Sequence, residues 1–359
     1  MTRADGQILV LAHDAGGAEL LAALLKAEGG GLDWAALTLT GAPAEAIFRR
    51  AGLPVLALPD AGQCAAQCAA RLRSAPWAAA LYNPGWGEFP QGLVRRELLG
   101  RIPCAAVLDS WSDYRERFGH PEKDWERGLP DAIALCDPRA LALAGELGLP
   151  RLARLRNRHL EALLERIAAR GRHCSAMTEG DLLFLSQTTA DPGMNADGNG
   201  RFVYAGAHEG RVLADLLSHG PELLRRFGAA RLRIRLHPSE TACRHLDLLG
   251  RSGLPFAVEQ ARQADLVDSI LAARAVIGIN TMALYTAWLC GRPTASLLPE
   301  AALGRVLPLP PELLFANAAE LLAADLAAMR PSAPDTFADA GLNDLLNLLR
   351  AGAPGRTPE

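Results

Sequence analysis

Short, continuous apolar runs alternate with helix-like stretches along most of the chain, and this alternation constrains the fold more than any other feature. Runs without polar alternation are typical of strands buried on both faces of a parallel sheet. Strands joined by helices in this order form right-handed βαβ units. The sequence therefore predicts α/β architecture with doubly wound sheets. The expected strands of the first half are Ile8–Ala12, Ala35–Thr40, Val55–Leu58, Ala78–Tyr82, Ala105–Leu108 and Ala132–Leu135.

Helical patterns lie between these runs, and the same cycle begins again in the second half. The first half is expected to contain helices at Ala18–Glu28, Ala44–Ala51, Gln63–Arg73, Gln91–Leu99, Arg139–Leu147 and Asn157–Arg170. The second half predicts strands at Asp181–Leu185, Arg231–Leu236, Phe256–Val258, Ala275–Ile279 and Thr294–Leu297, and helices at Arg211–Ser218, Glu240–Leu249, Ala264–Ala272 and Met282–Cys290.

A length of 359 residues suits two domains of about 150 to 180 residues each. Residues 171–180 carry little pattern, so we place the boundary near residue 175. The expected parts are two Rossmann-like domains, 1–175 and 176–335, followed by a helix and tail at 336–359. Paired domains of this kind bind ligands in a crevice at the carboxyl ends of their strands. The last helical pattern, Ala338–Leu349, is expected to pack back on the first domain.

Composition excludes several classes of protein. A formal net charge of -3 gives no reason to expect nucleic acid as a partner. No run approaches the roughly 20 apolar residues of a membrane span, and the first residues do not resemble a signal peptide. The seven cysteines form no metal-ligand pairs and suit a reducing compartment. We expect a cytoplasmic protein; peripheral association with a membrane stays open, and the oligomeric state is not predicted.

Polar residues and glycines follow the first expected strand. His13 and Asp14 offer two titratable groups, and Gly16 and Gly17 allow a ligand to approach the backbone at a helix start that favours anions. The segment lacks the GxGxxG fingerprint, so a nicotinamide or flavin cofactor is not expected. The alternative interpretation is a tight turn in which Asp14 caps the helix.

Two other loops of the first domain carry aromatic and polar side chains suited to sugars. One of these loops follows the strand Ala105–Leu108 and contains Asp109, Trp111, Asp113 and Tyr114. The alternative to a sugar-binding role is a surface loop whose Trp111 fills the core. Asn83 and Trp86 follow another strand.

The second domain has three candidate strand ends. His237 and Pro238 follow one strand, where a histidine can hydrogen-bond or protonate a phosphate oxygen. Another strand ends in polar side chains, Ser186 and Gln187. The third end offers a glycine for close approach, polar side chains and free helix amides, which together can cradle a phosphate or simply cap the helix. Its residues are Gly278, Asn280, Thr281 and Met282.

The segments RIRLHPSE and VIGINTMALYTAWLCGRPTASL resemble the nucleotide-sugar half of bacterial glycosyltransferase-B (GT-B) enzymes. This group includes sialyltransferases, capsule Kdo transferases and glycerophosphate polymerases that use CMP- or CDP-activated donors. The resemblance covers about 100 residues and maps His237 and Pro238 to the HP motif, and Asn280 and Thr281 to the later Ser/Thr pair. The chain departs from the group by its Asn-Thr pair and by the absence of the acidic D/E-D/E-G motif. The paired glutamates of retaining enzymes are also missing.

The resemblance implies a metal-independent, inverting transfer of a sugar from a nucleotide sugar, with a CMP-activated sialic-acid-like donor favoured and no cofactor. Asp14 or His13, with Asp109 as a third candidate, would deprotonate an acceptor hydroxyl, while His237 and the helix start stabilise the leaving phosphate. In this fold the first domain normally binds the acceptor, a glycan or another hydroxyl compound. Three alternatives stay open: an isomerase like the UDP-N-acetylglucosamine 2-epimerases, a CDP-glycerol-type transferase and a non-catalytic binding protein.

Overall fold

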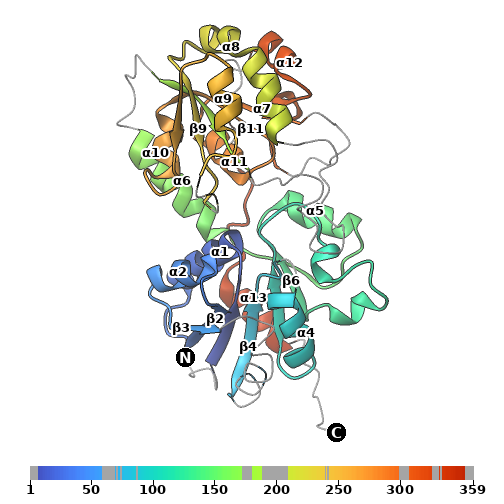
Figure 1. Cartoon of the computed structure of the whole chain (residues 1–359). Helices are drawn as coiled ribbons and strands as arrows, with labels where there is room; N and C mark the ends of the chain where they lie inside the picture. The colour runs from blue at the N-terminus through green and yellow to red at the C-terminus, as the bar shows by residue number, and fades with distance from the viewer. Residues whose placement is uncertain are drawn as a thin grey trace. The chain divides into compact units, whose positions relative to one another are not determined.

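Two parallel β-sheets form the centres of two units in the computed structural model of the chain (Figure 1). The first unit comprises Met1–Leu163 and Pro334–Glu359, and the second comprises Leu164–Ala333. The structure describes residues 7–58, 69, 72, 75–85, 88–171, 180–187, 209–238, 240, 242–298, 307–325, 331 and 334–351.

The first sheet has seven strands in the order β3-β2-β1-β4-β5-β6-β7, all paired in parallel. Its order reverses between β1 and β4, as in the doubly wound Rossmann fold. The strands are β1 Gln7–Leu11, β2 Trp34–Leu39, β3 Val55–Leu58, β4 Trp77–Tyr82, β5 Cys104–Val107, β6 Ala132–Leu135 and β7 Leu152–Arg154.

Helices cover both faces of this sheet, so each central strand is buried on both sides. In β1, Ile8 and Val10 join the core under α1, while Leu9 and Leu11 join the core on the opposite face. This two-sided burial explains why the strands lack polar alternation. The helices of this unit are α1 Ala15–Glu28, α2 Pro43–Arg50, α4 Leu93–Glu97, α5 Pro138–Glu146, the first part of α6 Arg158–Gly171, and α13 Leu342–Ala351.

The last described helix, α13, belongs to the first unit, as the sequence pattern indicates, and lies among its blue and cyan elements in Figure 1. Its apolar residues enter the same core as α1; they are Leu342, Leu345, Leu346 and Leu349. Glu28, at the end of α1, accepts hydrogen bonds from the Arg158 guanidinium and from the Leu342 amide. One carboxylate therefore joins the starts of α6 and α13 to the end of α1.

The second sheet has six parallel strands in the order β10-β9-β8-β11-β12-β13, which repeats the Rossmann order. Its strands are β8 Asp181–Leu185, β9 Leu232–Arg235, β10 Phe256–Glu259, β11 Ala273–Gly278, β12 Thr294–Leu297 and β13 Leu314–Phe315. Its helices are α7 Glu209–Ser218, α8 Gly220–Phe227, α9 Leu246–Arg251, α10 Leu266–Leu271, α11 Met282–Leu289 and α12 Ala318–Ala323, together with the remainder of α6.

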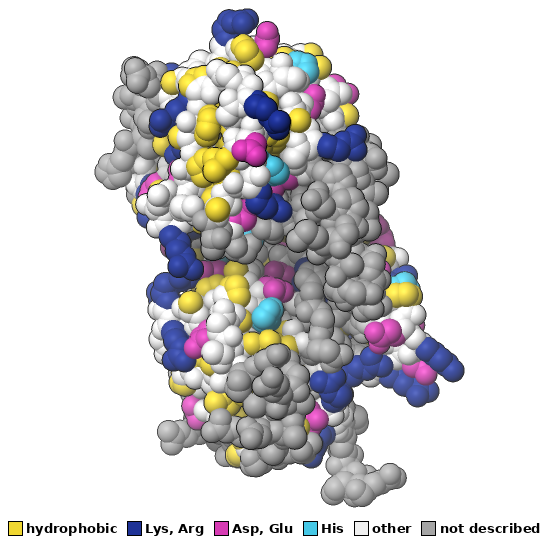
Figure 2. Space-filling view, in the orientation of Figure 1, with side chains coloured by type: hydrophobic (Ala, Val, Ile, Leu, Met, Phe, Trp, Pro, Cys, Tyr) yellow, Lys and Arg dark blue, Asp and Glu magenta, His cyan; other side chains and the backbone are white. Residues whose placement is uncertain are grey.

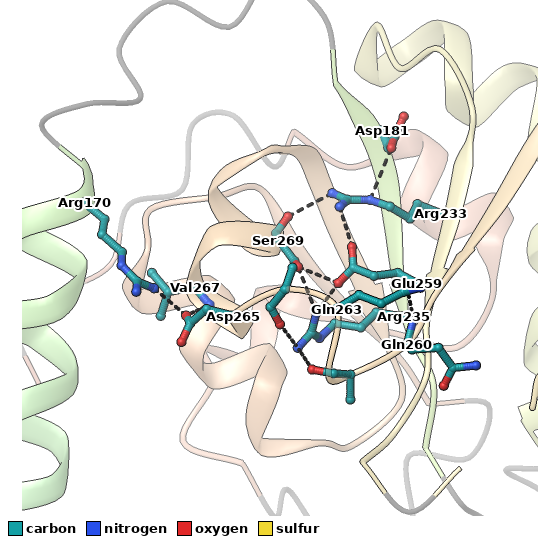
Figure 3. Close-up of polar contacts among 12 residues, drawn as sticks. Arg170, Asp181, Arg233, Arg235, Glu259, Gln260, Gln263, Asp265, Val267 and Ser269 are labelled. Atoms are coloured by element: carbon teal, nitrogen blue, oxygen red, sulfur yellow. Dashed lines mark hydrogen bonds and ion pairs between the residues drawn. The ribbon is translucent and has the colours of Figure 1, made fainter. Parts of the chain in front are cut away.

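A charged network is buried on one face of the second sheet (Figure 3). Arg233 and Arg235 project from β9 to the Glu259 carboxylate at the end of β10, which each of them contacts. Ser269 in α10 donates to the same carboxylate. Because all three partners surround one carboxylate, β9 can carry two arginines and still lie inside the sheet.

The observed elements confirm the predicted α/β class with two doubly wound domains. Among the described strands and α-helices, the pattern missed β7, α8, α12 and β13. It also placed a helix at Glu240–Leu249, whereas α9 begins at Leu246. The division between units falls inside α6, where a continuous helix offers no linker composition to mark it. The predicted helix Gln63–Arg73 lies almost wholly outside the described residues.

Candidate functional site

Each sheet brings the predicted polar residues to its topological switch point, the place where open α/β sheets bind ligands. In the first unit, His13 and Asp14 follow β1, Asn83 follows its neighbour β4, and Asp109 follows β5. The second unit places its own candidates after β8, β9 and β11; they are Ser186, Gln187, His237, Asn280 and Thr281. Two separate clusters result, one in each unit.

In the first cluster, the Asp109 carboxylate is held by two donors. Asn83 Nδ2 donates to Asp109 Oδ1 over 3.1 Å and also to the Val107 carbonyl over 2.9 Å. Arg117 lies 3.3 Å from the same carboxylate oxygen and donates to Ser110 Oγ over 2.9 Å. Since Asn83 is fully buried and the Arg117 side chain is only 8% exposed, the position of Asp109 is fixed by the core.

The two glycines at the start of α1 are required by this cluster. A Cβ atom at Gly17 would lie 2.2 Å from Asn83 Cγ, and one at Gly16 would lie 2.4 Å from Asp109 Oδ2. No side chain fits at such distances. Gly16 and Gly17 therefore bring the helix backbone against the side chains of Asn83 and Asp109, and their expected role in admitting a ligand stays a prediction.

Asp14 occupies the N-cap position of α1, but its side chain makes no capping hydrogen bond. The expected alternative, a carboxylate used as a cap, does not hold in this structure. Burial raises the pKa of Asp14; the charge of His13 lowers it, that of Asp109 raises it and that of Arg117 lowers it, with a net upward shift. A carboxylate with a raised pKa is a stronger base near neutral pH than an ordinary one.

His13 lies beside Asp14 and is half-buried. Its ring meets Phe89 edge to face, with centroids 6.3 Å apart. Its Nδ1 atom is buried and has no hydrogen-bond partner among the described residues. The histidine therefore retains a polar atom that a ligand or water can engage.

The predicted acceptor-binding residues have different surroundings. Tyr114 is fully buried, and its hydroxyl donates to the Ser110 carbonyl over 2.6 Å, so it shapes the loop and does not reach a ligand. Trp111 packs against the core and donates to Asp137 Oδ2 over 2.9 Å, the arrangement expected if it fills the core. Asp113 is half-buried in a left-handed backbone conformation. Trp86 lies outside the described residues.

In the second unit, the end of β11 is tied to the end of β8. The Asn280 amide donates to Gln187 Oε1 over 2.9 Å, while Asn280 Nδ2 is buried without a partner among the described residues. Thr281 is the N-cap of α11, and its hydroxyl accepts from the Ala283 amide at 3.4 Å, so it does cap the helix. A Cβ atom added at Gly278 would lie 3.3 Å from the Leu284 side chain, so the space beside this glycine is already filled by that side chain.

Two residues flank these strand ends. Met282 opens α11 and is 45% exposed, and Pro238 is exposed beside His237. The exposed Met282 and the unpartnered Nδ2 of Asn280 lie at the same helix start, where free backbone amides favour an anion.

His237 follows β9 and is held by a glutamate that the sequence reasoning did not select. Its backbone amide donates to Glu240 Oε2 over 2.8 Å, and Ser186 Oγ donates to the same oxygen over 2.7 Å. Burial lowers the pKa of His237, while the charges of Glu240 and Glu209 act to raise it. Glu240 therefore fixes the backbone at His237, and the charges of Glu240 and Glu209 act on its imidazole.

The residues missed by sequence reasoning are Glu209, Glu240 and Arg244. Glu209 accepts from the Gln187 amide over 3.2 Å, and its side chain is 1% exposed. A signal for Glu240 was available, because a glutamate three residues after a strand end can bond back to the backbone amide, as in a capping box. No local pattern identifies Glu209, since its partners are distant in sequence.

Charged side chains of both signs are interspersed with apolar ones on the face drawn in Figure 2. Among the described residues, no group of three or more His, Cys, Asp or Glu side chains has an arrangement that could hold a metal ion. The part of the chain described by the structure also contains no helix with the length and apolar character that crossing a membrane requires.

The two Rossmann-like sheets define a protein of the GT-B fold class. The structure is similar to the UDP-GlcNAc 2-epimerase from Neisseria meningitidis bound to UDP-GlcNAc, with a TM-score of 0.57, 12% identity and coverage of 81% of this chain and 82% of that chain. It is also similar to the UDP-N-acetylglucosamine 2-epimerase from Rickettsia bellii (TM-score 0.54, 11% identity, coverage 97% and 92%). A third similar structure is the Anabaena protein HepE in complex with UDP-glucose (TM-score 0.53, 14% identity, coverage 81% and 80%). No protein-family model matches the sequence, and no curated protein matches it.

Proposed function

We propose that the protein is an inverting glycosyltransferase that uses a nucleotide sugar, with Asp14 as the general base. The observation that carries this proposal is the Asp14 carboxylate, which occupies a helix N-cap without capping, lies at a topological switch point and has a raised pKa. Asp109 and Arg117 act on Asp14 through charge, and His13 is the second titratable group beside it.

The reaction follows from these groups. Asp14 takes the proton of an acceptor hydroxyl while the oxygen of that hydroxyl attacks the anomeric carbon of the donor sugar. The bond between that carbon and the phosphate oxygen breaks, and the nucleotide leaves with the electron pair. Attack opposite to the leaving group inverts the anomeric configuration. No metal or cofactor enters this scheme.

The second cluster is suited to the leaving phosphate. Negative charge grows on the phosphate oxygens in the transition state, and preorganised hydrogen-bond donors stabilise it. Asn280 Nδ2 and the first amides of α11 supply such donors at one strand end. His237 supplies an imidazole at another, where it can donate a hydrogen bond or a proton to the same group.

For the donor we propose a CMP-activated sialic-acid-like sugar and for the acceptor a glycan or another hydroxyl compound. The HP segment and the Asn-Thr helix start support a cytidine nucleotide through their resemblance to CMP- and CDP-dependent transferases. The similar solved structures are complexes or enzymes of UDP-sugars, so the nucleotide is the first property to measure.

Calorimetry with CMP, CDP, UDP, GDP and ADP tests the donor site in wild type, His237→Ala and the matched control His219→Ala. A nucleotide that binds the native state raises its apparent stability by mass action. We expect binding of CMP or CDP that is lost in His237→Ala and kept in His219→Ala. Binding of UDP alone would overturn the cytidine assignment, and no binding of any nucleotide would overturn the donor site.

An epimerase is the second candidate, because two of the similar structures are UDP-N-acetylglucosamine 2-epimerases. Such an enzyme needs titratable groups near the sugar ring, and Asp14, His13 and Asp109 are present in the first cluster. The two candidates differ in their need for an acceptor. Conversion of UDP-N-acetylglucosamine without an acceptor would establish the epimerase, whereas release of free nucleotide only with an acceptor present would establish the transferase.

A further inference from the structure

One arginine joins two buried glutamates at the strand ends of the second unit. Arg244 Nη2 lies 3.0 Å from Glu209 Oε2, and Arg244 Nε lies 3.2 Å from Glu240 Oε1. The carboxylates are 1% and 5% exposed, whereas the Arg244 side chain is 43% exposed. The guanidinium therefore compensates two charges that water does not reach, while its own outer surface faces solvent.

Each glutamate uses its other contacts to fix the backbone of a strand end. Glu240 accepts from the His237 amide, and Glu209 accepts from the Gln187 amide. Gln187 in turn accepts from the Asn280 amide through its side chain. The chain of contacts runs without interruption from Arg244 to the ends of β8, β9 and β11.

We propose that Arg244 is a positioning residue of the donor site, where its bridge between Glu209 and Glu240 sets the strand ends that bind the nucleotide phosphate. This inference rests on the proposed function. Arg244 acts through the two glutamates and need not touch the donor. Without the bridge, two like charges face each other without a common cation, and each can turn away from the amide it holds.

The bridge also governs the charge around His237. The charges that act on this imidazole are those of Glu240, from the same loop, and Glu209, from α7. Arg244 and His245, which precede α9, lie against these carboxylates. His245 Nε2 lies 3.6 Å from Glu209 Oε2. Burial lowers the pKa of His237, and the charges of Glu240 and Glu209 act to raise it. Because Arg244 compensates both carboxylates, we expect the loss of its positive charge to shift that pKa upward.

The test uses three variants of the full chain: Arg244→Gln, Arg244→Lys and the control Arg251→Gln, an exposed arginine of α9 in the same unit. Two properties are measured, CMP binding by calorimetry and the His237 titration by NMR in the protein without nucleotide. The titration needs no ligand, so it remains informative whatever the nucleotide.

Arg244→Gln is expected to raise the Kd for CMP by about tenfold or more, the loss typical of misplaced hydrogen bonds to a charged group, and to shift the His237 titration upward. Arg244→Lys keeps the charge but its single ammonium cannot bridge both carboxylates as the planar guanidinium does. It is therefore expected to leave the titration close to wild type while the Kd remains raised. Arg251→Gln should leave both properties unchanged.

A purely structural arginine would lower thermal stability and leave both readouts unchanged below the transition, and that result would overturn the proposal. If the wild type binds no CMP, UDP or other nucleotide, the proposed function and the donor-site role of Arg244 both fail. An upward shift of the His237 titration in Arg244→Gln alone would then still establish the bridge as the element that sets this strand end.

Discussion

The side-chain amide of Asn83 donates to Asp109 Oδ1 over 3.1 Å, and this contact holds the carboxylate that follows β5 against the start of α1. Arg117 approaches the same oxygen from the following loop. Burial raises the pKa of Asp14 most and the charge of His13 lowers it; in addition, the charge of Asp109 raises this pKa and that of Arg117 lowers it. The basicity of Asp14 therefore depends on residues that its own segment does not contain.

Replacing Asp109 by Asn removes one cause of the raised pKa of Asp14. Because a general base must be deprotonated, kcat/KM falls as the pH drops through the pKa of Asp14. In Asp109→Asn this acid limb is expected to move to lower pH, and the plateau rate to fall because the base is weaker. The measurement is the pH profile of kcat/KM, with Asp33→Asn at the amino end of β2 as a control. An acid limb that does not move would contradict the assignment.

Replacing Asp14 by Asn is expected to abolish transfer and to stabilise the fold at neutral pH. A carboxyl whose folded pKa is raised stabilises the protein fully below its unfolded pKa, and loses that contribution as the pH rises through the folded pKa. The amide mimics the neutral form at every pH. We expect a Tm about 2–4 °C above wild type at pH 7, the response of a domain of this size to about 1 kcal/mol. The difference should vanish at about pH 3.5, below the unfolded pKa. Equal Tm values at both pH values would contradict the burial argument.

Gly17→Ala is expected to destabilise the first unit by about 1–3 kcal/mol, because the new Cβ would lie 2.2 Å from the buried side chain of Asn83. Displacement of Asn83 also releases Asp109, so activity falls in parallel. Gly30→Ala is the matched control, since a Cβ there meets no described atom within 4 Å. Chemical unfolding measures both variants. Similar stabilities for the two would show that Asn83 moves at no cost.

Glu259→Gln is expected to cost about 3–5 kcal/mol, because it leaves Arg233 and Arg235 around a neutral group. Burial alone would raise the pKa of Glu259, but hydrogen bonds from Ser269 and Arg235 and the charges of both arginines lower it. Its contribution is therefore complete above the unfolded pKa and is lost as the pH falls through the lower, folded pKa.

Urea unfolding at pH 7 and at about pH 3 measures this cost, and the exposed Glu222→Gln in α8 serves as the control. The wild-type advantage over Glu259→Gln should be complete at pH 7 and reduced at about pH 3, which lies below the usual pKa of glutamate. An equal difference at both pH values would show that the carboxylate charge does not stabilise the network.

The sequence predicted the strands of both sheets because their burial on two faces leaves continuous apolar runs, as in β1 and β8. It missed β13, which has two residues, and β7, which has three, because such short runs carry no period. The helix expected from Glu240 fails for another reason. Glu240 turns back to His237 and Ser186, and this tertiary demand overrides a favourable helical pattern.

The candidate sites were predictable where a strand end carries polar residues in its own segment, as at Asp14 and Asn280. Positions that depend on contacts between distant segments were not. Tyr114 lies in a loop whose composition suits sugar binding, but its ring is buried and its hydroxyl donates to the Ser110 carbonyl. Glu209 and Arg244 are separated by 35 positions, and only the folded sheet brings them together.

The packing of α13 on the first sheet has a consequence for synthesis of the protein. Leu342, Leu345, Leu346 and Leu349 complete a core whose other buried members, from Ile8 to Leu155, precede the second unit in the sequence. While the ribosome produces the second unit, the nascent first unit exposes the apolar surface that α13 later covers. Its folding can be finished only after the second unit and α13 have emerged, so the order of completion is reversed relative to the order of synthesis.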